Sequence, residues 1–86
     1  MIEVAKECTV VKAYVLIVTE PGETGRLVEA IRKLPLVSEV HEVMGPYDIV
    51  AEIEAESLQE IPGILQEQIR SLPGIQSTTS LVAFPA

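Results

Sequence analysis

The segment Val10–Val18 constrains the fold more than any other part of the sequence. Eight of its nine residues are apolar, and only Lys12 interrupts the run. Most of them are β-branched or aromatic, which favours a strand. Because apolar and polar residues do not alternate, both faces of this strand must be covered, as in the centre of a sheet. The run is too short for a membrane-spanning helix, which takes about 20 residues.

A helix is predicted after the turn at Pro21-Gly22, because apolar residues recur there at helical spacing. Proline lacks an amide N–H and disfavours helical conformation in the residue before it, so Pro35 ends this helix. The apolar stripe consists of Leu27, Val28, Ile31 and Leu34.

Two strands are predicted next, Val37–Met44 and Tyr47–Glu54, joined by a tight turn at Gly45-Pro46. Charged residues are spread along the first of these strands, which is typical of a sheet edge. Apolar residues alternate along the second, so one of its faces is expected to be buried.

A second helix and a last strand complete the pattern. Ser57 and Glu60 match a capping box at the helix start. Pro62 either kinks this helix or is its first residue. Pro73-Gly74 ends it, and Ile75–Phe84 is predicted to be the final strand. The apolar stripe of this helix is Leu58, Ile61, Leu65, Ile69 and Leu72.

The predicted order is β-α-β-β-α-β, and the two halves are similar to each other. The segment 31–38 resembles the segment 69–76, thirty-eight positions later, since each is a helix end, a proline and a strand start. Two such halves make an α+β, ferredoxin-like fold, a four-stranded antiparallel sheet with two helices on one face. The 86 residues suffice for one domain, predicted over 11–86 after an N-terminal extension, 1–10.

The first and third strands are central in that fold, and one face of the sheet has no cover within the chain. Burying 400 Å² of apolar surface there contributes on the order of 10 kcal/mol before entropy costs, at about 25 cal/mol per Å². We therefore expect a sheet-to-sheet dimer, a dimeric α+β barrel. Irregular strand patterning is the alternative interpretation.

The charge balance limits the possible partners. Six Lys and Arg against thirteen Asp and Glu give a net charge of −7, which disfavours direct contact with nucleic acid. Cys8, the only cysteine, cannot form an intrachain disulfide, and the N-terminus lacks the pattern of a signal peptide. A cytoplasmic protein that does not enter membranes is expected.

Three motifs are similar to those of the effector-binding domain of Lrp/AsnC regulators, over roughly residues 11–84. They are Leu34-Pro35 followed by Val37, then Val43–Asp48 with its Gly-x-Tyr-Asp pattern, and Leu72–Ile75 before a Ser/Thr-rich strand. The resemblance implies dimers that form by sheet-to-sheet packing, rings of such dimers, and small amino acids bound between dimers. Full-length members carry an N-terminal helix-turn-helix, whereas ten residues precede the first strand here. A stand-alone version that acts through full-length Lrp/AsnC-like regulators is therefore expected.

The resemblance also implies the ligand-binding residues. An ammonium group needs an anion or a carbonyl, and Asp48 can supply it, while Gly45 lets the backbone approach closely. The alternative is a hairpin turn in which Asp48 accepts local amide bonds. Strand alternation splits the hydroxyl residues into two pairs, and the sequence does not say which pair faces the ligand. The candidates are Met44, Gly45, Tyr47, Asp48, Ser77, Thr78, Thr79 and Ser80.

A non-enzymatic role without a cofactor is the leading interpretation. Metal binding is not expected, because no His, Cys or acidic spacing resembles a ligand set. His41 is expected to be an exposed surface residue, with a general base paired to Asp48 as the alternative. Two other function classes stay open. One is an ACT-type regulatory domain, weakly suggested by Pro21-Gly22 and Gly25; the other is a small dimeric α+β barrel enzyme.

Overall fold

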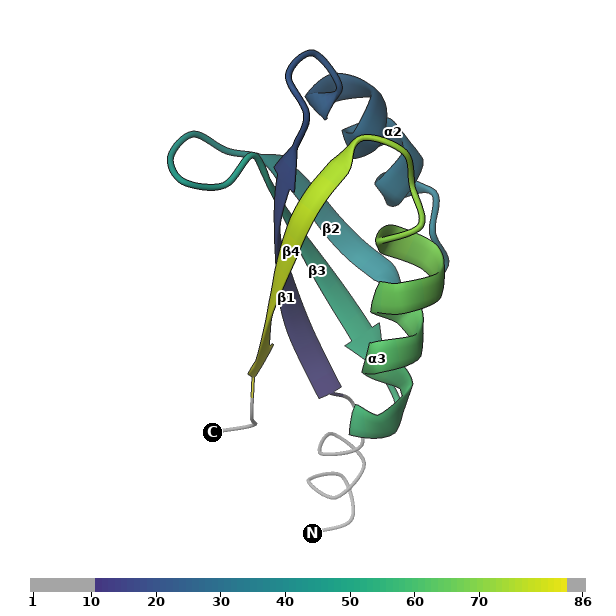
Figure 1. The fold of residues 1–86 in the computed structure, drawn as a ribbon. Coiled ribbons are helices and arrows are strands. Elements are labelled where there is room, and N and C mark those ends of the chain that lie inside the picture. Colours follow the sequence, from purple (N-terminus) through teal and green to yellow (C-terminus); the bar gives the residue numbers. More distant parts are fainter. Residues whose placement is uncertain (1–10, 84–86) are drawn as a thin grey trace, which may run out of the picture.

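The computed structural model, which describes residues 11–83, places the apolar segment in the interior of a four-stranded antiparallel sheet (Figure 1). This strand, β1 (Val11–Thr19), pairs with β3 (Ile49–Ala55) on one side and with β4 (Ile75–Ala83) on the other. Strand β2 (Val37–Glu42) pairs with β3. The order β2-β3-β1-β4 confirms the predicted α+β, ferredoxin-like sheet with β1 and β3 at its centre. The extension 1–10 lies outside the described residues, as do the predicted strand ends Val10 and Phe84.

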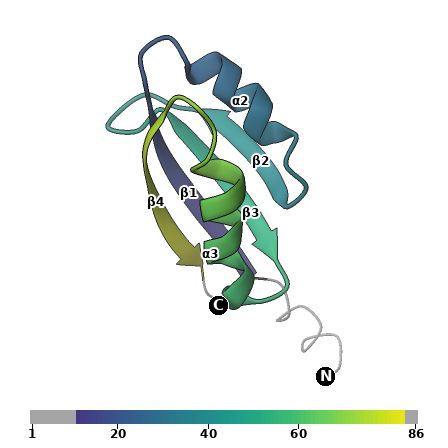
Figure 2. The same cartoon turned by 45° about the vertical axis from the view of Figure 1, so that its right-hand side comes forward.

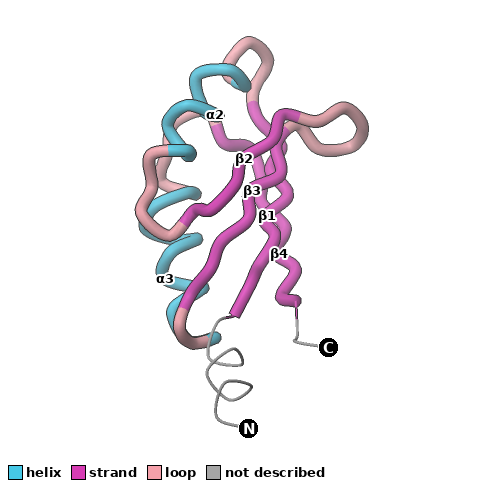
Figure 3. The backbone as a smooth tube through the Cα atoms, turned by 180° about the vertical axis from the view of Figure 1, so that it is seen from behind, coloured by secondary structure: helices cyan, strands magenta, loops and turns pink. Residues whose placement is uncertain are grey.

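Both helices lie on the same face of the sheet. Figures 1 and 2 show this arrangement, and Figure 3 shows it from behind. Helix α2 (Thr24–Arg32) follows β1. The second helical segment, residues 58–69, is composite. It begins with a 3-10 turn, Leu58–Glu60, continues as α3 (Ile61–Ile64) and ends as a π-helical turn, Leu65–Ile69.

The hydrophobic core fills the layer between the sheet and the two helices. Every second residue of β1 and β3 points into it, because side chains alternate between the faces of a strand. The helices contribute Leu27, Ile31 and Ile69, all fully buried. The strand residues in this layer are Ala13, Val15, Ile17, Val40, Ile49, Ala51, Ile53 and Ala55.

The Leu-Pro-Gly motif before β4 joins α2 to the sheet. Arg26 Nη2 donates a hydrogen bond of 2.8 Å to the carbonyl of Pro73, and the Glu20 amide donates one of 2.8 Å to the carbonyl of Gly74. Gly74 has a φ of +98°, and a Cβ added there would meet Arg26 and Glu23 at 3.1 and 3.2 Å. Glycine therefore suits this position by both backbone conformation and space.

The prediction of a capping box at Ser57 is wrong, because the side-chain hydrogen bond that defines it does not form. Ser57 is the N-cap residue, but its side chain makes no capping bond. Because the segment starts as a 3-10 turn, the Glu60 amide bonds the backbone carbonyl of Ser57 instead, at 3.2 Å. Pro62 is the second residue of α3, whereas one predicted alternative made it the first, and its missing amide costs no hydrogen bond in this first turn.

The turn between β2 and β3 is longer than predicted. Strand β2 ends at Glu42 rather than Met44, and β3 begins at Ile49 rather than Tyr47. The six intervening residues, 43–48, leave the sheet as a loop, closed by a 2.9 Å hydrogen bond from the Val43 amide to the Asp48 carbonyl.

We expect Ile69→Ala to lower the free energy of unfolding by about 2–5 kcal/mol, because Ile69 is fully buried and a cavity would remain. Leu58→Ala is the matched control in the same segment. Leu58 is 49% exposed, so its loss should cost less than about 1 kcal/mol. Urea denaturation measures both values, and equal losses would contradict the assigned core.

Candidate functional site

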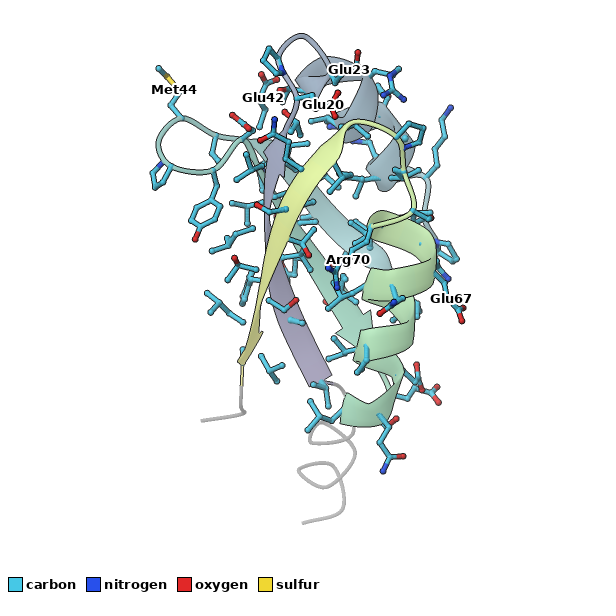
Figure 4. The ribbon with its side chains drawn as sticks, viewed as in Figure 1. Glu20, Glu23, Glu42, Met44, Glu67 and Arg70 are labelled. Atoms are coloured by element: carbon cyan, nitrogen blue, oxygen red, sulfur yellow. The ribbon has the colours of Figure 1, made fainter. Side chains whose placement is uncertain are left out.

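The loop 43–48 projects beyond the sheet at one end of the molecule (Figure 1). Met44 lies in its outer part and is 99% exposed (Figure 4). Gly45 has a φ of +133°, which side-chain-bearing residues rarely adopt, and a Cβ there would meet no atom within 4 Å. Glycine is therefore required by the backbone conformation of the loop rather than by a close neighbour.

Asp48 fastens the base of this loop to the end of β1. Its Oδ2 accepts hydrogen bonds from the amide of Thr19 at 2.9 Å and from the Thr19 hydroxyl at 3.3 Å. The Thr19 hydroxyl also bonds that of Thr24, at 2.7 Å, at the start of α2. The Asp48 amide donates to the carbonyl of Ile17 at 2.8 Å. This carboxylate thus ties the loop to β1, and the Thr19 hydroxyl extends the connection to α2.

These bonds are structural, as in the alternative given for Asp48, but they come from Thr19, 29 residues away, rather than from local amides of the turn. They do not use the whole side chain, because both donors found among the described residues point to Oδ2. A carboxylate has acceptor sites on two oxygens, so Oδ1 keeps capacity for a further donor. A ligand role for Asp48 stays a prediction.

Sequence analysis missed Thr19 and Thr24. The apolar pattern ends the first strand at Val18, whereas Thr19 is the last residue of β1 and only 6% exposed. A signal was present, because Thr19 continues the two-residue alternation of Val15 and Ile17 toward the core. A polar residue at an inward position needs a partner, and that need points to a nearby acceptor such as Asp48.

The hydroxyl residues of β4 divide between the two faces of the sheet. Thr78 is paired with Ile17 and Ser80 with Val15. Because paired residues share a face and both partners are fully buried, Thr78 and Ser80 face the helices. These two hydroxyls are therefore on the opposite side of the sheet from the other pair.

Ser77 and Thr79 lie on the open face, which we define as the side of the sheet away from the helices. They are paired there with Val18 and Leu16 of β1. Since β1 separates β4 from β3, Ser77 lies roughly 10 Å from the base of the loop at Asp48, two strand spacings away. One chain therefore does not bring the loop and these hydroxyls within reach of the same small ligand.

An apolar strip crosses the open face. Four of its side chains are half-buried, whereas Leu81 is 52% exposed. Lys12 and Glu52 form an ion pair of 3.2 Å beside it. The hydrogen bond and the charge of Glu52 raise the pKa of Lys12 above its ordinary value, so its ammonium stays protonated at neutral pH. The strip consists of Tyr14, Leu16, Val18, Val50 and Leu81.

His41 is exposed, as its surface interpretation predicted, and its Nε2 lies 2.9 Å from Glu39 Oε1. Its hydrogen-bond partner is thus Glu39 and not Asp48, which removes the general-base pair considered above. Within residues 11–83, no group of three or more His, Cys, Asp or Glu could hold a metal ion. No helix in that range is long and apolar enough to cross a membrane.

The chain matches a protein-family model described as the Lrp/AsnC ligand binding domain, over residues 12–85. An uncharacterized HTH-type transcriptional regulator of Pyrococcus furiosus is 39% identical over 75 residues, covering 84% of this chain and 50% of the relative. A regulator of the same description from Pyrococcus abyssi is 35% identical over 75 residues, again covering 84% of this chain and 50% of the relative. The chain thus spans about half the length of the curated relatives it matches.

Solved structures share the fold. A crystal structure from Thermus thermophilus is 39% identical, with a TM-score of 0.84, and the match covers 88% of this chain and 95% of that one. The structure of AsnC from E. coli has a TM-score of 0.85 at 19% identity, over 95% of this chain and 56% of that one. The family-model match confirms the resemblance seen in the sequence, in preference to the ACT-type alternative.

Replacing Asp48 by Ala should destabilise the fold by about 1–3 kcal/mol, because the buried Thr19 amide loses its acceptor. Asp48→Asn should cost less, since its amide oxygen can still accept that bond. Glu42→Ala, an exposed position beside the loop, serves as the control. Thermal or urea denaturation compares the three variants, and an Asp48→Ala loss no larger than that of Glu42→Ala would refute the role of this carboxylate as a clamp.

Proposed function

The chain belongs to the Lrp/AsnC ligand-binding domain family, and on that premise we propose that it is an amino-acid-sensing and oligomerisation module. Two copies pack through the open faces of their sheets. A small amino acid binds where the loop 43–48 of one dimer meets a neighbouring dimer in a ring of dimers. The observation that carries this proposal is the apolar strip on the open face.

The strip favours a sheet-to-sheet dimer on energetic grounds. Its five apolar side chains come from three neighbouring strands and form a continuous band. Monomers rarely leave such a patch bare. Covering 400 Å² of it contributes on the order of 10 kcal/mol before the costs of association, at about 25 cal/mol per Å². That gain exceeds the lower range of those costs.

The Lys12–Glu52 ion pair of the open face is compatible with such a dimer. Glu52 is close to buried already, with 15% of its side chain exposed, and Lys12 neutralises it. Covering an unpaired charge would be costly, whereas this pair enters an interface with its partner in place.

We expect light scattering at micromolar concentration to give at least twice the chain mass of 9.3 kDa. Leu16→Lys should shift the protein toward monomer, because it places a charge in the middle of the strip. Gln59→Lys is the control, since Gln59 is exposed on the helix side. A mass of 9.3 kDa for the unchanged protein would rule out the dimer.

Three features support an amino acid as the ligand. The loop offers the free Oδ1 of Asp48 for an ammonium group. A regulator from Neisseria meningitidis, solved as an L-Met complex, shares the fold with a TM-score of 0.79 at 14% identity. The loop is short and projects from the sheet, so a pocket there needs a second dimer.

A thermal-shift screen with the twenty amino acids should find at least one that raises the melting temperature. Asp48→Asn should then weaken its binding about ten- to a hundredfold in calorimetry, because the charge-assisted bond to the ammonium is lost. Glu42→Gln, next to the loop, should leave binding unchanged. Leu16→Lys should bind weakly, because assembly and binding are linked. If no amino acid binds at millimolar concentration, the sensing part of the proposal fails while the dimer test stands on its own.

The module is proposed to act without catalysis and without touching DNA. Its relatives are transcriptional regulators, which favours a non-enzymatic role. The net charge of −7 opposes binding to a polyanion. Mixed oligomers with full-length Lrp/AsnC-like regulators in the cytoplasm would connect it to transcription.

A further inference from the structure

A groove lies between the second helical segment and β4, on the face of the sheet opposite the open face. Its volume is about 330 Å³. It lies beside the second half of β4, whereas the loop 43–48 is at the end of the sheet where β4 begins. The groove is thus separate from both surfaces described above. Its principal lining residues are Leu58, Ile61, Leu65, Arg70, Ser80 and Val82.

Most of the lining is apolar, and part of it is uncovered. Leu58 is 49% exposed at the rim, and Leu65 and Val82 are half-buried. Exposed apolar surface that is gathered in a concave site, rather than scattered singly, favours a ligand with an apolar part.

Arg70 is the one charged residue that lines the groove among the described residues. Figure 4 shows its side chain extending from the helix toward β4, whereas Glu67 points away on the other side of the helix. The other two arginines form ion pairs with nearby glutamates, Arg26 with Glu23 and Arg32 with Glu29. Arg70 makes no such ion pair with another described residue, so its guanidinium is available to an anion.

The backbone brings the apolar and charged parts of the lining together. The Arg70 amide donates a 2.8 Å hydrogen bond to the carbonyl of Leu65, five residues earlier, which closes a π-helical turn. Such turns are rare and frequently occur at functional sites. Ser80 faces the helices from β4 and adds a hydroxyl donor across the groove.

We propose that this groove binds a small monocarboxylate with an apolar chain. The chain packs against Leu58, Leu65 and Val82, and the carboxylate pairs with Arg70 and accepts a hydrogen bond from Ser80. A chain of about four to six carbons suits a volume near the lower limit of ligand pockets. This site needs neither an ammonium group nor a second dimer, and it does not use Asp48.

Three probes on the unchanged, ¹⁵N-labelled full chain test the proposal by NMR titration. They are 4-methylpentanoate, its neutral amide 4-methylpentanamide, and acetate, which lacks the apolar chain. 4-Methylpentanoate should bind with a dissociation constant of about 1 mM or lower. It should shift the amide signals of Leu65, Arg70 and Ser80. The other two probes should bind at least about tenfold more weakly, because each lacks one half of the recognised chemistry.

Arg70→Gln should weaken 4-methylpentanoate binding about ten- to a hundredfold, while Arg32→Gln, an exposed arginine on α2, should not change it. Asp48→Asn should also leave it unchanged, which separates this groove from the proposed amino-acid site. The proposal is overturned if the carboxylate does not saturate, if the amide binds equally well, or if the shifted signals belong to the loop 43–48. None of these results depends on whether an amino acid binds the loop.

Discussion

The burial of β1 between two neighbouring strands and beneath the helices is the constraint on which the rest of the structure depends. Ala13, Val15 and Ile17 point into the core without exposure, and the alternate residues of the same strand form the centre of the open face. A strand that is apolar on both faces cannot lie at an edge or face water without cost. The central position of β1 and the need for an outer cover therefore follow from one nine-residue segment.

The register of β4 against β1 gives the two faces of the sheet different chemistry. It sends Ser77 and Thr79 to the open face, and Thr78 and Ser80 to the helix side. The three exposed large apolar residues of the described chain mark three separate surfaces. They are Met44 in the projecting loop, Leu81 on the open face and Leu58 at the rim of the groove. The groove needs neither of the other two surfaces, whereas the proposed amino-acid site at the loop depends on assembly through the open face.

Asp48 shows how one residue can serve the fold and still be available for binding. One carboxylate oxygen clamps Thr19 and so holds the loop to β1 and α2. The other oxygen faces no donor within the described chain. A loop anchored in this way projects from the sheet while its base is held in place, which suits a contact between dimers. It also means that a change at Asp48 reports on binding only when the clamp is kept, as Asp48→Asn is designed to do.

The sequence by itself determined the order of the elements, the central position of β1 and the family, because periodicity, turn residues and motifs are local. Only the tertiary structure decided the face of each β4 hydroxyl, since a shift of one residue in register would exchange them. It alone revealed the bond between Asp48 and Thr19, which are 29 residues apart, and the groove that joins Arg70 to Ser80. It also replaced the capping box at Ser57 by a 3-10 turn, because backbone bonding in that turn left the side chain without a partner. Contacts between distant segments depend on how strands and helices pack, and no local pattern encodes that.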